Sequence, residues 1–297
     1  PYPTYNRKWY MSNDVVCTIS KVTDDIVANV APEVDRYYIP HAVDGNIFKT
    51  LPDADVMNAK ISTLGSVAKD KFVFLWNNRN ARRKQSGSLI FWFKEFLDKV
   101  GHESACLIMH TEPHDPNGQD LIQIIEHLEL DKGQILLSTE KYPPQQLAMM
   151  YNIADCTVNI SDAEGFGLAT LESLACKTPI IATMTGGLQE QITNGEEWFG
   201  IGIEPSSKAI IGSQEIPWIY EDRLNGDDVV EALVKMYNMS AEERKQMAER
   251  GYQHVMMNYN FENFERIWVE TMDGINDKYG SWDTRKNYKS WDLVEIE

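Results

Sequence analysis

The sequence predicts an α/β protein, a parallel sheet with helices on both faces. From about residue 71 to residue 258, short apolar segments alternate with amphipathic segments of helical period. An apolar run such as Cys156–Ile160, followed by a turn rich in glycine, is typical of a buried strand. Strands that alternate with helices form βαβ units, in which the strands run parallel. A length of 297 residues allows one large or two ordinary domains, each with its own core.

The expected elements follow the order βαβαβαβαβ of a Rossmann-like unit. The strands are Phe72–Trp76, Ala105–His110, Ile135–Ser138, Cys156–Ile160 and Pro179–Thr183, and the helices between them are Ser88–Val100, Gln119–Leu128, Pro144–Asn152 and one that begins after Gly167. Residues 195–222 show no helical period and are expected to form an extended excursion. Helices are expected at Lys21–Val30 before this unit, and at Gly226–Tyr237, Ala241–Met257 and Phe261–Ile275 after it. A ligand is expected at the carboxyl ends of the strands.

Charge and composition exclude several classes of partner. The net charge of −17 argues against non-specific binding of nucleic acid and against docking on anionic lipid. No segment has the apolar length of a membrane span, and the start of the chain lacks a signal-peptide pattern. The four cysteines and six histidines lack the spacing of a zinc site or a disulfide framework. We therefore expect a cytoplasmic protein without a metal or other cofactor.

The segment 164–175 is the most informative part of the chain. Gly165 and Gly167 form a turn between a strand and a helix, where backbone amides and the helix dipole favour a phosphate. Glu164 and Glu172 flank this turn, and their carboxylates suit the hydroxyl groups of a sugar or a ribose. The combination predicts a site for a sugar nucleotide. A plain tight turn with a solvated glutamate is the simpler alternative.

This segment resembles the donor-binding signature of retaining glycosyltransferases with the GT-B fold. The resemblance covers E-G-F-G-L-x-x-L-E (164–172), A-C-x-T-P-I-I-A-T (175–183) and G-G-x-x-E (186–190). It implies that Glu164 contacts the donor sugar and Glu172 the ribose. It also implies that Phe166, Gly167 and Leu168 hold the phosphates and sugar through backbone amides. Two departures are Ala169 in place of proline and Lys177 in place of glycine.

The only dense cationic cluster, residues 79–84, follows the first strand of the expected sheet. Arginine and lysine can grip a diphosphate and stabilise charge on a leaving nucleotide. In the resembled family, an arginine and a lysine five positions apart have this task, and Arg79 and Lys84 have that spacing. Arg82 or Arg83 could share the role, and a solvated charged face is the plain alternative.

The resemblance also implies a domain organisation and a function. Residues 1–40 would be the remnant of an N-terminal acceptor domain with the start of a linker. Residues 41–260 would be the donor-binding domain, the C-terminal half of a GT-B fold, and residues 261–297 a helix and tail that pack back toward the N-terminal part. Trp282 and Trp291 would lie in a packed tail, with a tail that seeks a partner as the alternative. Thr139 and Tyr142, after another strand, would contact the base, although a surface turn is equally compatible.

The function implied is metal-independent transfer of a hexose from a nucleotide-diphosphate sugar, with retention, to a glycan, lipid or small-molecule acceptor. The catalytic residues would be Glu164, Arg79 and Lys84, with Arg83 among the donor-binding residues. A UDP-sugar 2-epimerase-like enzyme and a non-catalytic nucleotide-sugar binding module are the alternatives. The donor, the acceptor and the oligomeric state, with a homodimer as one option, stay open.

Overall fold

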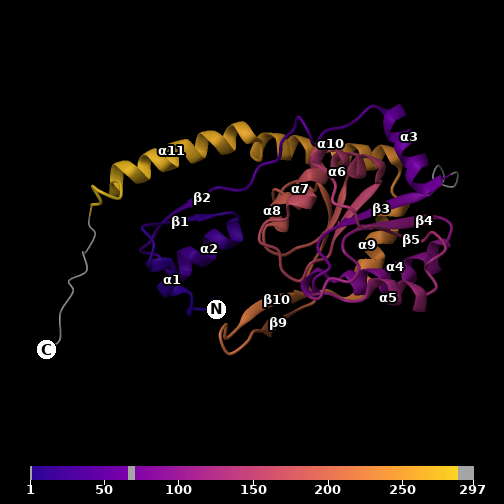
Figure 1. Ribbon diagram of the computed structural model, residues 1–297, viewed down its shortest axis with the longest axis horizontal. Helices are drawn as coiled ribbons and strands as arrows, with labels where there is room; N and C mark the ends of the chain where they lie inside the picture. The colour runs from indigo at the N-terminus through magenta and orange to yellow at the C-terminus, as the bar shows by residue number, and fades with distance from the viewer. Residues whose placement is uncertain (1, 66–70, 287–297) are drawn as a thin grey trace.

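A six-stranded parallel sheet forms the centre of the molecule. The computed structural model describes residues 2–65 and 71–286. The strands lie in the order β5-β4-β3-β6-β7-β8; the first three are labelled in Figure 1. They are β3 (Phe72–Asn77), β4 (Ala105–His110), β5 (Ile135–Ser138), β6 (Cys156–Asn159), β7 (Ile180–Thr183) and β8 (Gly200–Ile203). The expected fold class is confirmed, and every neighbouring pair in this sheet is parallel.

The sixth strand, β8, was missing from the sequence-based prediction. Its sequence, Gly-Ile-Gly-Ile, carries too little apolar character to indicate a strand. Gly200 is required for a steric reason, because a Cβ at this position would lie 2.5 Å from the carbonyl oxygen of Ile180 on β7. The five predicted strands occur with ends that differ by at most one residue.

Helices cover both faces of the sheet. They are α4 (Ser86–Val100), α5 (Leu121–His127), α6 (Pro144–Ile153), α7 (Leu168–Ala175), α8 (Leu188–Ile192), α9 (Gly226–Asn238) and α10 (Ala241–Asn258). The short 3₁₀ turn η2 (Arg82–Lys84) precedes α4. One further helix, α3 (Asp53–Leu64), packs against α6 and was not among the expected helices.

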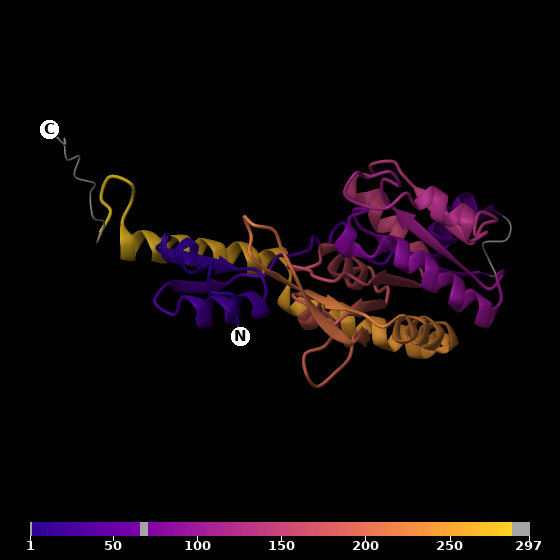
Figure 2. The ribbon, with the colours of Figure 1, turned by 90° about the horizontal axis from the view of Figure 1, so that it is seen from below.

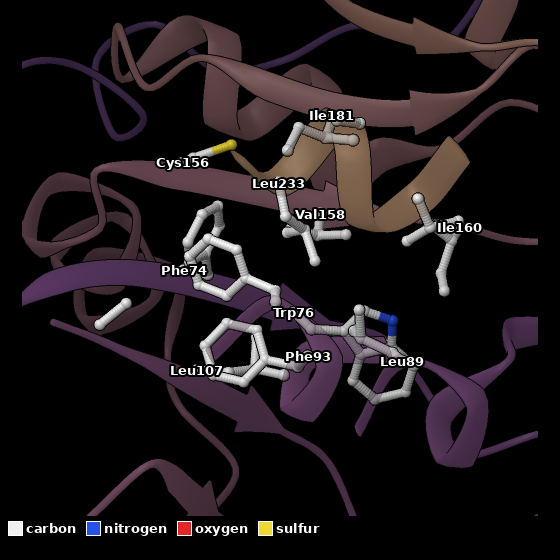
Figure 3. Packing of buried hydrophobic residues seen from close by; sticks show 14 of the residues in the cluster. Phe74, Trp76, Leu89, Phe93, Leu107, Cys156, Val158, Ile160, Ile181 and Leu233 are labelled. Atoms are coloured by element: carbon white, nitrogen blue, oxygen red, sulfur yellow. The ribbon is translucent and has the colours of Figure 1, made fainter. Parts of the chain in front are cut away.

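Alternation along β3 divides the core into two layers. Phe72, Phe74 and Trp76 face one layer, whereas Val73 and Leu75 face the other. The first layer includes α4 and α9, and Figure 3 shows Phe74, Phe93 and Leu233 within this cluster. The rings of Phe74 and Phe93 meet edge to face at 5.8 Å. Because both of its faces are buried, β3 is apolar along most of its length, and this apolar run allowed the strand to be predicted from the sequence.

The N-terminal part forms a small unit beside the sheet (Figures 1 and 2). It contains α1 (Arg7–Met11), β1 (Val15–Thr18), α2 (Lys21–Val30) and β2 (Asp35–Tyr38), and β1 pairs in parallel with β2. The carboxylate of Glu190, on α8, joins this unit to the sheet domain. It accepts hydrogen bonds from the Lys21 backbone amide and the Tyr38 hydroxyl, both at 3.0 Å.

The last helix, α11 (Phe261–Tyr279), runs from the sheet domain along the N-terminal unit (Figure 2). Near its end, Lys278 forms an ion pair with Asp35, and the Tyr279 hydroxyl donates to the same carboxylate at 2.6 Å. After Gly280 the chain leaves the helix, and the side chain of Trp282 is 90% exposed. The expectation of a packed tail is therefore wrong for Trp282, and Trp291 lies outside the described residues.

A two-stranded hairpin projects from the same side of the sheet domain as the N-terminal unit (Figure 1). Its strands are β9 (Ser207–Ile211) and β10 (Ile219–Arg223), which pair antiparallel. The predicted extended excursion thus contains both this hairpin and β8.

Two further properties concern the described residues as a whole. None of their helices combines the length and the apolar character that a membrane crossing requires. The four cysteines carry free thiols, three of them buried.

Candidate functional site

The strand order reverses between β3 and β6, and the loops that follow these two strands meet there. Open α/β sheets bind ligands at such a reversal. The backbone amide of Asp162, after β6, donates to the carbonyl of Arg83 at 2.8 Å. The Arg83 guanidinium donates in turn to the carbonyl of Ala163 at 2.6 Å. The cationic loop therefore lies against the bend that opens α7.

The bend depends on three glycines. Gly167 precedes α7 with a φ of 95°, a conformation that favours glycine. Gly186 and Gly187 press against the bend from the other side, and a Cβ on Gly186 would lie only 1.7 Å from the carbonyl oxygen of Glu164. Since α7 begins at Leu168, the amides of its first turn have no acceptor within the helix. The turn thus has the polarity of an anion site.

Lys84 and Glu164 form an ion pair at the centre of this site. The Lys84 ammonium donates to the Glu164 carboxylate, and both side chains are largely buried. Burial lowers the pKa of Lys84, while the neighbouring carboxylate opposes that shift. The Arg83 guanidinium lies 3.8 Å from the same carboxylate. The structure therefore brings together three of the predicted site residues, Arg83, Lys84 and Glu164.

The two remaining arginines of the cluster have other partners. The Arg79 side chain is 64% exposed and binds Asp115, in the loop after β4, with an N–O distance of 2.6 Å. Its hydrogen bond lowers the pKa of Asp115. The Arg82 guanidinium forms a bidentate ion pair with the Glu221 carboxylate on β10, with N–O distances of 3.0 and 2.6 Å. The predicted spacing of Arg79 and Lys84 therefore does not place both cations beside the bend in this structure.

Glu172 lies in a short hydrogen-bonded chain that starts at the end of β3. The side-chain amide of Asn77 donates to the Tyr151 hydroxyl at 2.8 Å, and this hydroxyl donates to the Glu172 carboxylate at 2.7 Å. Burial raises the pKa of Glu172 to about 7, although the hydrogen bond from Tyr151 lowers it. The fixed carboxylate retains acceptor capacity for further hydroxyl groups.

The predicted base-contact residues follow β5. Thr139 is exposed, and the Tyr142 ring stacks on His110 with a centroid distance of 4.9 Å. Burial lowers the pKa of His110. Nearby, at the ends of β3 and β4, Asn78 Nδ2 and Thr111 Oγ1 are buried without a hydrogen-bond partner in the described part of the chain. Unpaired buried polar atoms at a ligand-binding edge suit the polar groups of a nucleotide.

The departure at Lys177 affects only the end of α7. Lys177 adopts a φ of 58°, the left-handed conformation in which glycine is usual. The following residue, Thr178, donates its backbone amide to the carbonyl of Ser173 at 3.0 Å, so the helix still closes normally. The Lys177 ammonium contacts Glu249 at 2.7 Å and lies over the Tyr252 ring.

Sequence reasoning missed the contribution of β10. Its last three residues, Glu221, Asp222 and Arg223, bind respectively Arg82, Thr185 and Asp162, the last at 2.5 Å. The backbone amide of Asp222 also donates to the Asp162 carbonyl at 2.8 Å. The pair Ile219 and Tyr220 after Pro217, two residue types that are enriched in strands, was the signal that could have indicated a strand.

A cavity of about 910 Å³ adjoins the bend, between the N-terminal unit and the hairpin. It shares Arg83, Glu164 and Gly186 with the site described above. Within residues 2–65 and 71–286, no group of three or more His, Cys, Asp or Glu side chains is placed to hold a metal ion.

The chain matches a known sequence family and known relatives. The profile of the family described as "Glycosyl transferases group 1" matches residues 64–254. A probable sucrose-phosphate synthase from Thermosipho melanesiensis is 33% identical over 174 residues, which is 57% of this chain and 37% of that protein. A D-inositol 3-phosphate glycosyltransferase from Acidothermus cellulolyticus is 32% identical over 132 residues, or 40% of this chain and 30% of that protein. The chain thus aligns with roughly a third of the length of these two relatives.

Solved structures share the fold at low identity. Sucrose-phosphate synthase from Thermosynechococcus elongatus superposes with a TM-score of 0.73 at 19% identity, over 92% of this chain and 61% of that chain. Anabaena HepE, solved in complex with UDP and glucose, gives a TM-score of 0.70 at 14% identity, over 92% of this chain and 67% of that chain. At these identities the likeness concerns the fold.

Proposed function

The chain belongs to the glycosyl transferases group 1 family, and on this premise we propose that it transfers a hexosyl group from a nucleotide-diphosphate sugar to an acceptor hydroxyl. The observation that carries the proposal is the contact of Lys84 with Glu164, at the reversal of strand order and beside the bend before α7. A cation and a carboxylate at this point can bind a phosphate and a sugar hydroxyl that belong to the same donor.

The proposed reaction retains the configuration of the anomeric carbon. The bond from this carbon to the donor phosphate oxygen breaks, and a bond to the acceptor oxygen forms on the same face. The acceptor proton passes to the departing phosphate oxygen. Lys84 and Arg83 would stabilise the charge on the leaving nucleotide, and the amides of Phe166, Gly167 and Leu168 would hold it.

Each remaining residue has a proposed part. Glu164 would orient the donor sugar through its carboxylate, which the Lys84 pair fixes in place. Glu172 would accept hydrogen bonds from the ribose hydroxyls, with Tyr151 as its positioning residue. Thr139 and Tyr142 would contact the base. Arg79 would contribute to leaving-group stabilisation only after exchanging Asp115 for the diphosphate.

We also propose the domain roles. Residues 41–260 would bind the donor, residues 1–40 would belong to an acceptor domain and the linker, and residues 261–297 would join the two. The links through Glu190 to Lys21 and through Lys278 to Asp35 support such an arrangement, because both connect the N-terminal unit to the rest of the chain.

Binding of the donor is tested by thermal unfolding with UDP-, GDP-, ADP- and dTDP-sugars. A ligand that binds only the folded state raises Tm with its concentration, so at least one of the four should do so. Lys84→Met and Glu172→Ala should remove most of that shift. The matched controls are Lys60→Met, which breaks the pair with Asp155 outside the site, and Glu126→Ala, which removes an exposed glutamate of α5. Both controls should keep the shift.

Chemistry is tested with the nucleotide sugar selected in this way. NMR of the product should show the anomeric configuration of the donor. Lys84→Met should reduce the transfer rate by roughly 10²- to 10³-fold, as expected for loss of a group that stabilises developing charge. Comparison of Arg79→Ala with Arg83→Ala decides which arginine acts. Absence of any Tm shift, or equal shifts in the site variants and the controls, would contradict the proposal.

A further inference from the structure

A single residue, Asp162, binds both chain neighbours of Lys84. The backbone amide of Asp162 donates to the carbonyl of Arg83 at 2.8 Å. The Asp162 carboxylate accepts from the side-chain amide of Gln85, whose nitrogen lies 2.8 and 2.7 Å from the two carboxylate oxygens. Asp162 also comes two positions before Glu164, the partner of the Lys84 ammonium. Asp162 therefore joins the two loops that carry this ion pair.

The backbone of Gln85 has an unusual conformation, which its side chain supports. Gln85 is the N-cap of α4 and has a φ of 55°, in the left-handed region that residues other than glycine seldom adopt. Both ends of its side-chain amide are bound. The oxygen accepts from the Ser88 hydroxyl at 2.6 Å, and the nitrogen donates to Asp162. These hydrogen bonds stabilise a disfavoured conformation at the residue that directly follows Lys84.

Asp162 is a buried carboxylate to which the proposed reaction assigns no part. The residue is only 1% exposed. Burial raises the pKa of Asp162, whereas the hydrogen bond from Gln85 and the charge of Arg223 lower it. Arg223, on β10, contacts one of the carboxylate oxygens at 2.5 Å and supplies the opposite charge. A buried polar group whose partners are all in place makes its surroundings rigid.

The Lys84 ammonium needs a rigid support, because it is carried on a flexible four-carbon chain. In the proposed reaction it must lie beside the leaving phosphate, and a displacement of about 1 Å can cost on the order of 10²-fold in rate. We propose that Asp162 is a positioning residue, which sets the place of the Lys84 ammonium through the Gln85 amide and the Arg83 carbonyl. This inference rests on the proposed function, since it states how Lys84 is held for that reaction.

The first test is Gln85→Leu, because leucine keeps the approximate size of the side chain and removes its amide. The kcat for transfer from the selected nucleotide sugar should fall roughly tenfold or more, while the donor KM changes by less than about threefold. The lysine charge stays near the phosphate, so binding of the donor loses less than stabilisation of the leaving group. Gln85→Gly suits the left-handed backbone but also lacks the amide, and it should show the same loss.

The matched control is Gln123→Leu. It removes another hydrogen bond between a glutamine and an aspartate, from Gln123 to Asp120 at 3.1 Å, at the start of α5. This control should keep the wild-type kcat and KM.

An exchange of the hydrogen-bonding roles should rescue the rate. Gln85→Glu alone sets two carboxylates against each other, so kcat should fall at least as far as in Gln85→Leu. In the double variant Gln85→Glu/Asp162→Asn, the amide introduced at position 162 can donate to the carboxylate introduced at position 85. The net charge is that of the wild type, and kcat should return to within roughly threefold of it.

Amine labelling with mass spectrometry tests the support of Lys84 without any transfer reaction. The Lys84 side chain is 9% exposed and ion-paired, so its reductive methylation in the wild type should be slow. Gln85→Leu and Gln85→Gly should accelerate it roughly tenfold, through easier local opening, whereas Gln123→Leu and the double variant should not. If the wild type binds no nucleotide sugar, the proposed function is contradicted, and labelling still decides whether Asp162 and Gln85 hold Lys84.

Three results would overturn the inference. One is wild-type kcat, or wild-type labelling of Lys84, in both Gln85→Leu and Gln85→Gly. Another is a loss of kcat that equals the loss of folded protein, measured by circular dichroism and by Tm without ligand, since that result indicates a merely structural role. The third is a double variant that is no more active than Gln85→Glu.

Discussion

The two walls of the crevice are built in different ways. The bend and the glycine pair that supports it lie within residues 164–190, so a single continuous stretch encodes most of that wall. The facing wall combines the first residues of the chain with a hairpin more than 200 positions later. The first wall is a backbone structure of glycines and amides, whereas the second consists of aromatic rings and ion pairs. A continuous backbone motif can be recognised in a sequence, but a surface assembled from distant side chains cannot.

The largest expected effect comes from Gly186→Ala, which tests whether the close backbone contact with Glu164 is needed for the wall formed by residues 164–190, the bend wall. The new Cβ would overlap the Glu164 carbonyl, 1.7 Å away, so the bend must shift. We expect a loss of about 3 kcal/mol in the free energy of unfolding and loss of nucleotide binding. Chemical denaturation and calorimetry measure both. Gly195→Ala is the control, because Gly195 has a φ of 95° but no atom within 4 Å of its Cβ position. Equal effects in both variants would mean that conformation, not contact, matters.

A smaller effect concerns the pH dependence of nucleotide binding, which depends on Glu172 of the bend wall. Because burial raises the pKa of Glu172 to about 7, the carboxylate predominates only above that pH. Ribose hydroxyls donate to the ionised form, so affinity should be highest above pH 7 and fall about tenfold for each pH unit below it. Calorimetry between pH 5.5 and 8 measures the profile, and Glu172→Gln should flatten it. An unchanged slope in the variant would exclude Glu172 as the titrating group.

The same carboxyl has an opposite effect on stability. Its folded-state pKa lies above the ordinary value of 4.5, so its contribution to the free energy of unfolding declines as the pH rises from about 4.5 to about 7. Binding and folding thus favour different protonation states of Glu172. This conflict is a property expected at a functional site.

The smallest effect tests the hairpin wall. Glu221→Gln removes the ion pairs of β10 with Arg82 and Arg223, which lower the pKa of Glu221. We expect a loss of about 1–2 kcal/mol in unfolding free energy at neutral pH, with the nucleotide Kd unchanged. Since the folded pKa is depressed, the wild-type advantage should disappear as the pH falls through that pKa. Glu215→Gln, an exposed position in the hairpin turn, is the control. A large loss of nucleotide binding would instead indicate that the hairpin contributes to the donor site.

Prediction from the sequence succeeded where burial or backbone chemistry leaves a local pattern. Strand β3 was readable because both of its faces are buried, and the bend was readable because only glycine fits its tight contacts. Strand β8 could not be predicted, since Gly200 is required by the close approach of a carbonyl on β7, 20 residues earlier. The ion pair of Arg79 with Asp115 could not be predicted either, because spacing along the chain does not show that the two side chains are close in space. The roles of the site residues remain predictions.

The alternating side chains of β10 also constrain how the hairpin can form. Glu221 and Arg223 point to one face of the strand and Asp222 to the other, where it meets Thr185. A slip of one residue would exchange these faces, and in one direction it would put Asp222 in the place of Arg223 beside Asp162. The native pairing of β9 with β10 therefore keeps the ion pair of Arg223 with Asp162, which that slipped pairing would replace with two carboxylates.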